Sequence, residues 1–178
     1  ARLEKRKNHK KIIYAVHDLT KEFQNLLYLI AGDGPEMKKI SKLIDKLNLK
    51  KNVKILGKVN ERDKAFLFKI SDLHVMPTIL DKRSLSIEGF GISYIEAGIH
   101  GIPSISSGLG GTKESVIDGK TGIICNPNNV SSIKDSIRKV LINKTMYKKL
   151  SINSKNFSKK FLWKNTIRNY LKLITKDF

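Results

Sequence analysis

Apolar runs of strand length alternate along this chain with segments in which apolar residues recur at helical spacing. The predicted strands are residues 26–31, 52–56, 72–76, 102–106 and 121–125. The predicted helices are residues 8–22, 35–47, 61–70, 91–100, 112–117, 130–142, 145–158 and 162–176. Strands separated by helices are typical of parallel βαβ units. We therefore expect an α/β fold with a Rossmann-like, doubly wound parallel sheet and helices on both of its faces.

Length and composition fit one domain of this kind. A chain of 178 residues with 40% hydrophobic and 29% charged residues can bury a sizeable core. No run of about 18 apolar residues occurs, so the sequence predicts no membrane span. The single cysteine, Cys125, excludes an internal disulfide and a cysteine-rich metal site, and its apolar neighbours predict that it is buried in a strand.

The formal net charge of +19 is far from neutral. Lysine supplies most of it, because only six of the 35 basic residues are arginine. One interpretation is a lysine-rich composition with solvated helix faces; the other is attraction to an anionic membrane surface or to phosphorylated ligands. Nucleic acid is not predicted as a partner, since the basic stretches lack interleaved aromatics, zinc-finger spacing and an RRM signature.

Glycine-rich loops follow predicted strands or enter predicted helices at 32–34, 89–91 and 108–111. Ligands of doubly wound sheets bind outside the carboxyl ends of the strands, where such loops meet. We therefore expect the three loops to gather at one edge of the sheet. The first loop is not a dinucleotide-binding G-x-G-x-x-G motif, because Met37 occupies the third glycine position, and an ordinary β-to-α turn is the alternative.

The segment Glu88-Gly-Phe-Gly-Ile-Ser-Tyr-Ile-Glu96 places two carboxylates eight positions apart, around a loop that runs into a helix. A helix N-terminus offers backbone N–H groups and a positive dipole end to an anion. Carboxylates accept hydrogen bonds from hydroxyl groups. A site that binds an anion at its centre and hydroxyl groups at both ends matches a nucleotide-diphosphate sugar. The alternative is a carboxylate at a helix N-terminus together with an exposed helical glutamate.

Five motifs in family order make the chain resemble the group 1 (family four) glycosyltransferases. Residues 88–122 resemble the signature of these retaining enzymes, and Glu88 and Glu96 match their E-x7-E motif. The other motifs lie at residues 2–7, 32–35, 53–59 and 71–77. Asn8 departs from the family pattern, which usually has glycine after the lysine. The resemblance covers essentially the whole chain and implies the C-terminal, donor-binding domain of a GT-B glycosyltransferase.

The resemblance implies three catalytic residues. Glu88 is implied to contact the donor sugar near the reacting carbon. Arg2 and Lys7 are implied to neutralise the pyrophosphate. Without the resemblance, a solvated basic turn of a lysine-rich chain is the favoured interpretation of these two cations.

The resemblance also implies a set of donor-binding residues. They are Gly32, Gly34, Lys58, Val59, Gly89, Phe90, Gly91, Ile92 and Glu96. Glu96 is implied to hold the ribose, and the amides of residues 90–92 to meet the phosphates. Lys58 and Val59 are implied to lie against the base, and the 32–34 loop to approach the nucleotide.

The implied reaction is the retaining transfer of a hexose from a UDP- or GDP-linked donor to a glycan or lipid-linked acceptor, as in polysaccharide biosynthesis. Cations and amide dipoles would stabilise the charge that develops on the departing diphosphate. The sequence has no Asp-x-Asp motif and no histidine cluster, so we predict no metal and no cofactor. The alternatives are a non-catalytic basic module that binds a nucleotide sugar or a membrane surface, and a sugar-nucleotide epimerase.

We expect residues 1–178 to form a single nucleotide-sugar-binding domain, without the acceptor-binding N-terminal domain and the first strand of the fold. Residues 161–178 resemble the tail helix that crosses back to that domain. Because the family takes its acceptor side from the other domain, the isolated chain is expected to be inactive. The expected partners are the donor, the N-terminal domain and, through charge, an anionic membrane at its cytoplasmic face. The expected location is the cytoplasm.

Overall fold

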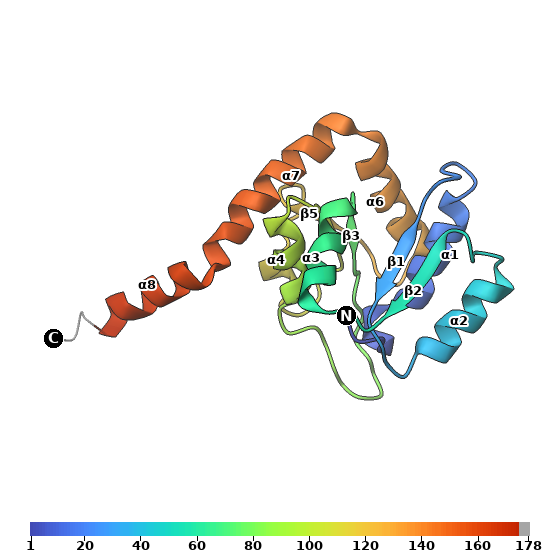
Figure 1. Ribbon diagram of the computed structural model, residues 1–178, viewed down its shortest axis with the longest axis horizontal. Helices are drawn as coiled ribbons and strands as arrows, with labels where there is room; N and C mark the ends of the chain where they lie inside the picture. Colours follow the sequence, from blue (N-terminus) through green and yellow to red (C-terminus); the bar gives the residue numbers. More distant parts are fainter. Residues whose placement is uncertain (175–178) are drawn as a thin grey trace.

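The computed structural model describes residues 1–174 and shows an α/β fold with parallel strands (Figure 1). The strands are β1 (Tyr28–Ala31), β2 (Val53–Gly57), β3 (His74–Val75), β4 (Ser104–Ser106) and β5 (Gly122–Ile124). The α-helices are α1 (His9–Leu19), α2 (Met37–Lys46), α3 (Glu61–Ile70), α4 (Ile92–Ile99), α5 (Thr112–Ser115), α6 (Val130–Ile142), α7 (Lys144–Ser158) and α8 (Trp163–Ile174). The 3-10 helices are η1 (Lys5–Lys7) and η2 (Lys159–Phe161). The predicted fold class is therefore confirmed.

Within the described residues, the strands form two parallel sheets, β1–β2 and β3–β4–β5. Tyr28 of β1 lies opposite Val53 of β2. In the other sheet, Ile105 of β4 pairs with Val75 on one side and Ile123 on the other. The strands are parallel as predicted, but β1 and β3 are not paired, so hydrogen bonds do not join the two sheets into one.

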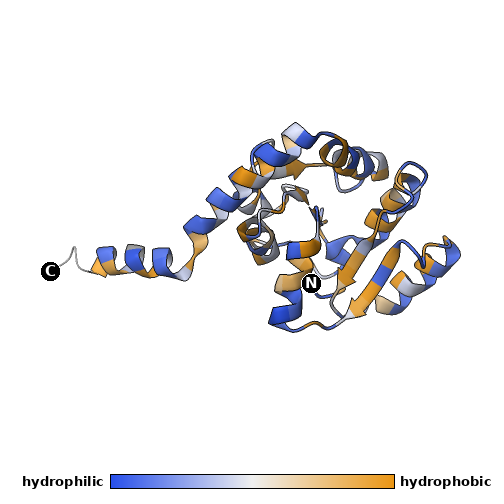
Figure 2. Cartoon of the chain, turned by 45° about the horizontal axis from the view of Figure 1, so that its top comes forward, coloured by the Kyte–Doolittle hydropathy of each residue, from blue (hydrophilic) through white to orange (hydrophobic). Residues whose placement is uncertain are grey.

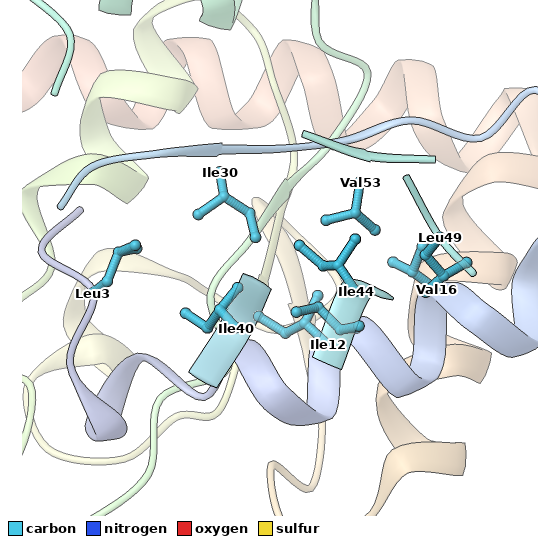
Figure 3. Packing of buried hydrophobic residues seen from close by; sticks show 9 residues of the cluster. Leu3, Ile12, Val16, Ile30, Ile40, Ile44, Leu49 and Val53 are labelled. Carbon is cyan, nitrogen blue, oxygen red and sulfur yellow. The ribbon is translucent and has the colours of Figure 1, made fainter. Parts of the chain in front are cut away.

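Helix α1 connects the two sheets through its side chains. One set of its residues packs with β1, β2 and α2 (Figure 3), and this cluster includes Ile12, Ile13, Val16, Ile30, Ile40, Ile44 and Val53. Ala15 and Leu19 pack instead with Ile105 of β4, Ile123 of β5 and Ile133 of α6. Because apolar residues of α1 recur at helical spacing, the helix buries one face against each sheet.

Residues 1–3 run beside the carboxyl end of β1. The amide of Leu3 donates to the carbonyl of Asp33 at 2.8 Å, and its carbonyl accepts from the amide of Glu36 at 3.0 Å. A Cβ atom at Gly32 would lie 1.7 Å from the carbonyl oxygen of Ala1, and one at Gly34 would lie 2.6 Å from that of Leu3. The glycines of this loop therefore allow the two backbone segments to approach closely.

Helix α8 extends as an arm from the body of the molecule, whereas α7 packs against α4 (Figure 1). The ring of Phe161 packs against those of Phe157 and Phe90, with centroids 5.2 and 5.5 Å apart. Beyond this point Trp163 is 80% exposed, and apolar and polar residues alternate along α8 (Figure 2). The last predicted tail residues, 175–178, lie outside the described residues. No helix of the described part is long and apolar enough to cross a membrane.

Most element boundaries differ from the predictions by one to three residues. The helix predicted over 8–22 ends at Leu19, although Thr20 keeps right-handed helical angles and its amide still donates to the carbonyl of Val16 at 2.9 Å. Cys125 lies just after β5 rather than within it, although its amide still donates to the carbonyl of Ser106. Cys125 is buried as predicted, and burial raises the pKa of its thiol to about 12.

Candidate functional site

The centre of the candidate site is Glu88, a carboxylate that is only 9% exposed. The guanidinium of Arg6 donates to its Oε2 atom at 2.5 Å, and the ammonium of Lys7 donates to the same oxygen. Lys7 is itself buried, at 7% exposure. Burying an unpaired charge is costly. Pairing with the two cations offsets the desolvation of Glu88, and pairing with Glu88 offsets the desolvation of the cations. The site therefore holds two positive charges around one negative charge.

The backbone around η1 explains how Arg6 and Lys7 reach Glu88. Asn8 ends η1 in a left-handed conformation, with φ of 60°. Its side-chain amide donates to the carbonyls of Pro77 at 2.9 Å and Pro127 at 2.8 Å. Asparagine tolerates this backbone region better than most residues. This accounts for asparagine at a position where glycine is usual, and it fixes η1 to the loops that follow β3 and β5.

Arg2 is linked to Glu88 indirectly, through Glu4 and Arg6. Its Nε atom is 3.3 Å from Glu4, and the other oxygen of Glu4 accepts from Arg6 at 2.9 Å. The side chain of Arg2 is 73% exposed. Of the two cations predicted to act together, the structure brings Lys7 to Glu88. Arg6, which the motif did not single out, is the second cation in contact with that carboxylate.

The loop after Glu88 turns sharply into α4. Gly91 precedes the helix with φ of 82°, and a Cβ atom there would lie 2.5 Å from the ring of Tyr94. That ring is fixed because the buried hydroxyl of Tyr94 donates to the carbonyl of Met76, and burial raises the pKa of this hydroxyl. The amides of residues 90–92 have no hydrogen-bond acceptor within residues 1–174. These amides and the positive end of α4 are thus available to an anion.

The 108–111 loop packs directly on this turn. The amide of Gly111 donates to the carbonyl of Glu88 at 3.1 Å, and a Cβ atom at Gly111 would lie 1.7 Å from the carbonyl oxygen of Gly89. The hydroxyl of Ser115 donates to the carbonyl of Phe90 at 2.7 Å. These contacts tie down the carbonyls of the turn. Two of the three glycine-rich loops therefore meet, as expected from their places in the sequence.

Glu96, on the second turn of α4, is paired with a residue that the sequence did not predict. The ammonium of Lys64 on α3 donates to Oε1 of Glu96 at 2.7 Å and lies 2.8 Å from Glu61. Hydrogen bonds to Glu61 and Glu96 raise the pKa of Lys64. The side chains of Lys64 and Glu96 are each 31% exposed, so solvent reaches both.

The remaining predicted residues lie at the carboxyl ends of β1 and β2. The amide of Gly32 donates to the carbonyl of Gly57 at 2.7 Å, which brings the 32–34 loop to the end of β2. Lys58 and Val59 follow directly and lead into α3. They therefore lie between the end of β2 and the helix that carries Lys64. Among residues 1–174, no cluster of histidine, cysteine, aspartate or glutamate has metal-binding geometry, and metal independence stays a prediction.

Residues 1–157 match the family described as "Glycosyl transferases group 1". The match includes both glutamates, η1 and every glycine-rich loop described above. The chain belongs to this family. Its curated relatives include an uncharacterized glycosyltransferase of Methanocaldococcus jannaschii, which is 32% identical over 91% of this chain and 42% of the relative.

Two further comparisons extend the picture. A GDP-mannose-dependent alpha-(1-6)-phosphatidylinositol monomannoside mannosyltransferase of Mycolicibacterium smegmatis is 27% identical over 79% of this chain and 37% of the relative. The crystal structure of Anabaena HepE in complex with UDP superposes with a TM-score of 0.84 at 20% identity, covering 100% of this chain and 47% of that one. The fold is that of the C-terminal domains of GT-B glycosyltransferases. The chain spans less than half the length of these relatives.

Proposed function

We propose that this chain binds the nucleotide-diphosphate sugar donor of a retaining glycosyltransferase that transfers a hexose. The observation that carries the proposal is the buried Glu88, held by Arg6 and Lys7 beside the N-terminus of α4. Membership of the group 1 glycosyltransferases supports a transferase over an epimerase. A diphosphate has the charge and the oxygen atoms that this combination of cations and amides accepts.

The geometry at Glu88 supports different roles for its two carboxylate oxygens. Arg6 and Lys7 both donate to Oε2, which leaves Oε1 for a hydroxyl group of the donor sugar. A phosphate oxygen would then share the two cations with Glu88. As the bond to the sugar breaks, negative charge grows on the departing diphosphate, and the fixed cations stabilise that charge more than they stabilise the intact donor. We propose that this electrostatic arrangement serves in place of a metal.

The comparisons support a nucleotide donor without selecting its base. GDP-mannose stands in the name of one relative, and UDP is bound in one solved structure of similar fold. Uracil and guanine differ in size and in hydrogen-bonding groups. We propose that residues 58–59 discriminate between the two bases. Glu96 is proposed to hold the ribose hydroxyl groups, which both donors share.

The acceptor side is proposed to come from the part of the full-length protein outside these 178 residues. The support is length: the chain covers 42% and 37% of two relatives that are themselves glycosyltransferases. We propose that the exposed apolar side chains of α8, including Trp163, contact that part. The isolated chain is therefore proposed to bind donor without transferring sugar. The net charge of +19 supports a peripheral position at an anionic membrane on its cytoplasmic side.

Calorimetric titration of the purified chain with UDP, GDP and ADP tests the proposal. We expect heat of binding with at least one of them, and binding that weakens as salt is added. Lys7→Met should weaken it about tenfold or more, since a charge-assisted hydrogen bond to phosphate is lost. Lys10→Met, which changes an exposed lysine of α1, is the matched control and should bind as the unaltered chain does. Absence of heat with all three nucleotides would refute the proposal.

A further inference from the structure

Lys64 makes a contact between two helices. Its ammonium reaches from α3 to Oε1 of Glu96 on α4 at 2.7 Å. Within residues 1–174, no hydrogen bond other than that from Lys64 reaches the side chain of Glu96, so Oε2 remains available. The pair thus presents a donor and an acceptor side by side, both at 31% exposure.

A second contact fixes the distance between the two helices. The ring of Phe68 stacks on that of His100, with centroids 5.9 Å apart and planes inclined by 19°. Phe68 lies four residues after Lys64, and His100 lies four residues after Glu96, so both contacts occur on facing sides of the helices. No residue of α3 is fully buried, and these contacts are therefore important in orienting the helix.

The pair with Glu96 is not needed to satisfy Lys64. Glu61, three residues earlier on the same helix, lies 2.8 Å from its ammonium and would suffice as an ordinary surface ion pair. Exposed pairs of that kind contribute little to stability. The additional reach to α4 places this cation against Glu96, and that position has a chemical consequence.

We propose that Lys64 is a specificity-determining residue, which together with Glu96 selects nucleotides that carry ribose hydroxyl groups. The inference rests on the proposed function. A ribose hydroxyl is both donor and acceptor. It donates to Oε2 of Glu96 while its oxygen accepts from Lys64, and Lys64 also keeps the carboxylate from rotating away. When a nucleotide lacks these hydroxyl groups, neither Lys64 nor Glu96 forms a hydrogen bond with it.

The chemistry also explains why the two residues must act as a unit. Without Lys64, Glu96 has no fixed orientation and accepts from the ribose less well. Without Glu96, Lys64 retains Glu61 as partner and is drawn back onto its own helix. Removing either residue is therefore expected to abolish most of the discrimination, and removing both to add little more.

The experiment compares the dissociation constants of a ribonucleoside diphosphate and its 2′,3′-dideoxy analogue by calorimetry, using whichever of UDP and GDP binds. We expect the unaltered chain to prefer the ribose form by roughly tenfold or more. Lys64→Met should reduce the preference to within about twofold, as should Glu96→Gln, and the double variant should resemble either single variant. Lys69→Met is the matched control, because it removes an exposed lysine of the same helix, and it should keep the full preference.

The outcomes separate the inference from the proposed function. A Lys64→Met chain that binds nucleotide and keeps the preference of the Lys69→Met chain overturns the inference alone. A chain that binds no nucleoside diphosphate overturns both. Loss of affinity in Lys64→Met by the same factor for both forms also overturns the inference, because it indicates a general effect of charge or of helix stability.

Discussion

Replacing Lys7 by methionine should destabilise the fold because it leaves a buried carboxylate with one cation fewer. Lys7 and Glu88 are 7% and 9% exposed, and the methionine fills a similar volume without charge. Breaking a buried ion pair by removing one partner typically costs about 3–5 kcal/mol. Here Arg6 still donates to the same oxygen at 2.5 Å. We therefore expect a cost below that range, about 2–3 kcal/mol.

Thermal unfolding followed by circular dichroism measures this cost. For a domain of this size, about 1 kcal/mol corresponds to about 2–4 °C, so the midpoint should fall by roughly 4–12 °C. The matched control is Lys5→Met, because Lys5 belongs to the same η1 but its side chain is 52% exposed and lies 3.8 Å from Asp81. That change should alter stability by less than about 0.5 kcal/mol.

A double substitution distinguishes loss of charge balance from loss of packing. Glu88→Gln removes the carboxylate that Lys7→Met leaves undercompensated, so the double variant should be more stable than the sum of the two single effects predicts. If Lys7→Met costs no more than Lys5→Met, or if the two effects simply add, the ion pair does not hold η1 in the way that the geometry indicates.

Two other predictions concern stability. Burial lowers the pKa of His9 to about 4, from an ordinary value near 6.5, so its neutral form is favoured in the fold. The resulting stability is present above about pH 6.5 and is lost as the pH falls toward 4; denaturant titrations across this range should show the loss, and a His9→Gln chain should show less of it. Gly91→Ala forces a side chain into φ of 82° and against Tyr94, and should cost about 1–3 kcal/mol in urea unfolding. Gly89→Ala is its control, since no described atom lies within 4 Å of a Cβ there; equal costs would contradict the steric argument.

The order of helices and strands could be predicted from the sequence because apolar periodicity depends on residues close together in the chain. The resemblance placed Lys7 and Glu88 in one donor site, but it did not predict the hydrogen bond between them. Arg6 and Lys64 could not be found in this way. Arg6 contacts Glu88 only because η1 turns it there, and Lys64 meets Glu96 only because α3 and α4 lie side by side. Both are tertiary effects, and with 35 basic residues in the chain neither position stands out in the sequence.

The division into two sheets was equally beyond a strand-by-strand prediction. Each predicted strand was found, but pairing depends on which edges meet in space, and β1 and β3 do not pair within the described residues. The departure at Asn8 shows the opposite case. There a single substitution was visible in the sequence, and its φ of 60° in the structure gives the physical reason for it.

The two faces of α1 have a consequence for how the protein unfolds. Ile12 and Val16 belong to the core under β1 and β2, whereas Ala15 and Leu19 belong to the core under β4 and β5. Neither sheet can detach without exposing one of these faces to water, at about 1.5–3 kcal/mol for each large side chain. The two sheets should therefore unfold cooperatively, although β1 and β3 are not paired. Because η1 leads directly into α1, a ligand that immobilises Lys7 would slow amide exchange on both sides of the molecule, including strands it never touches.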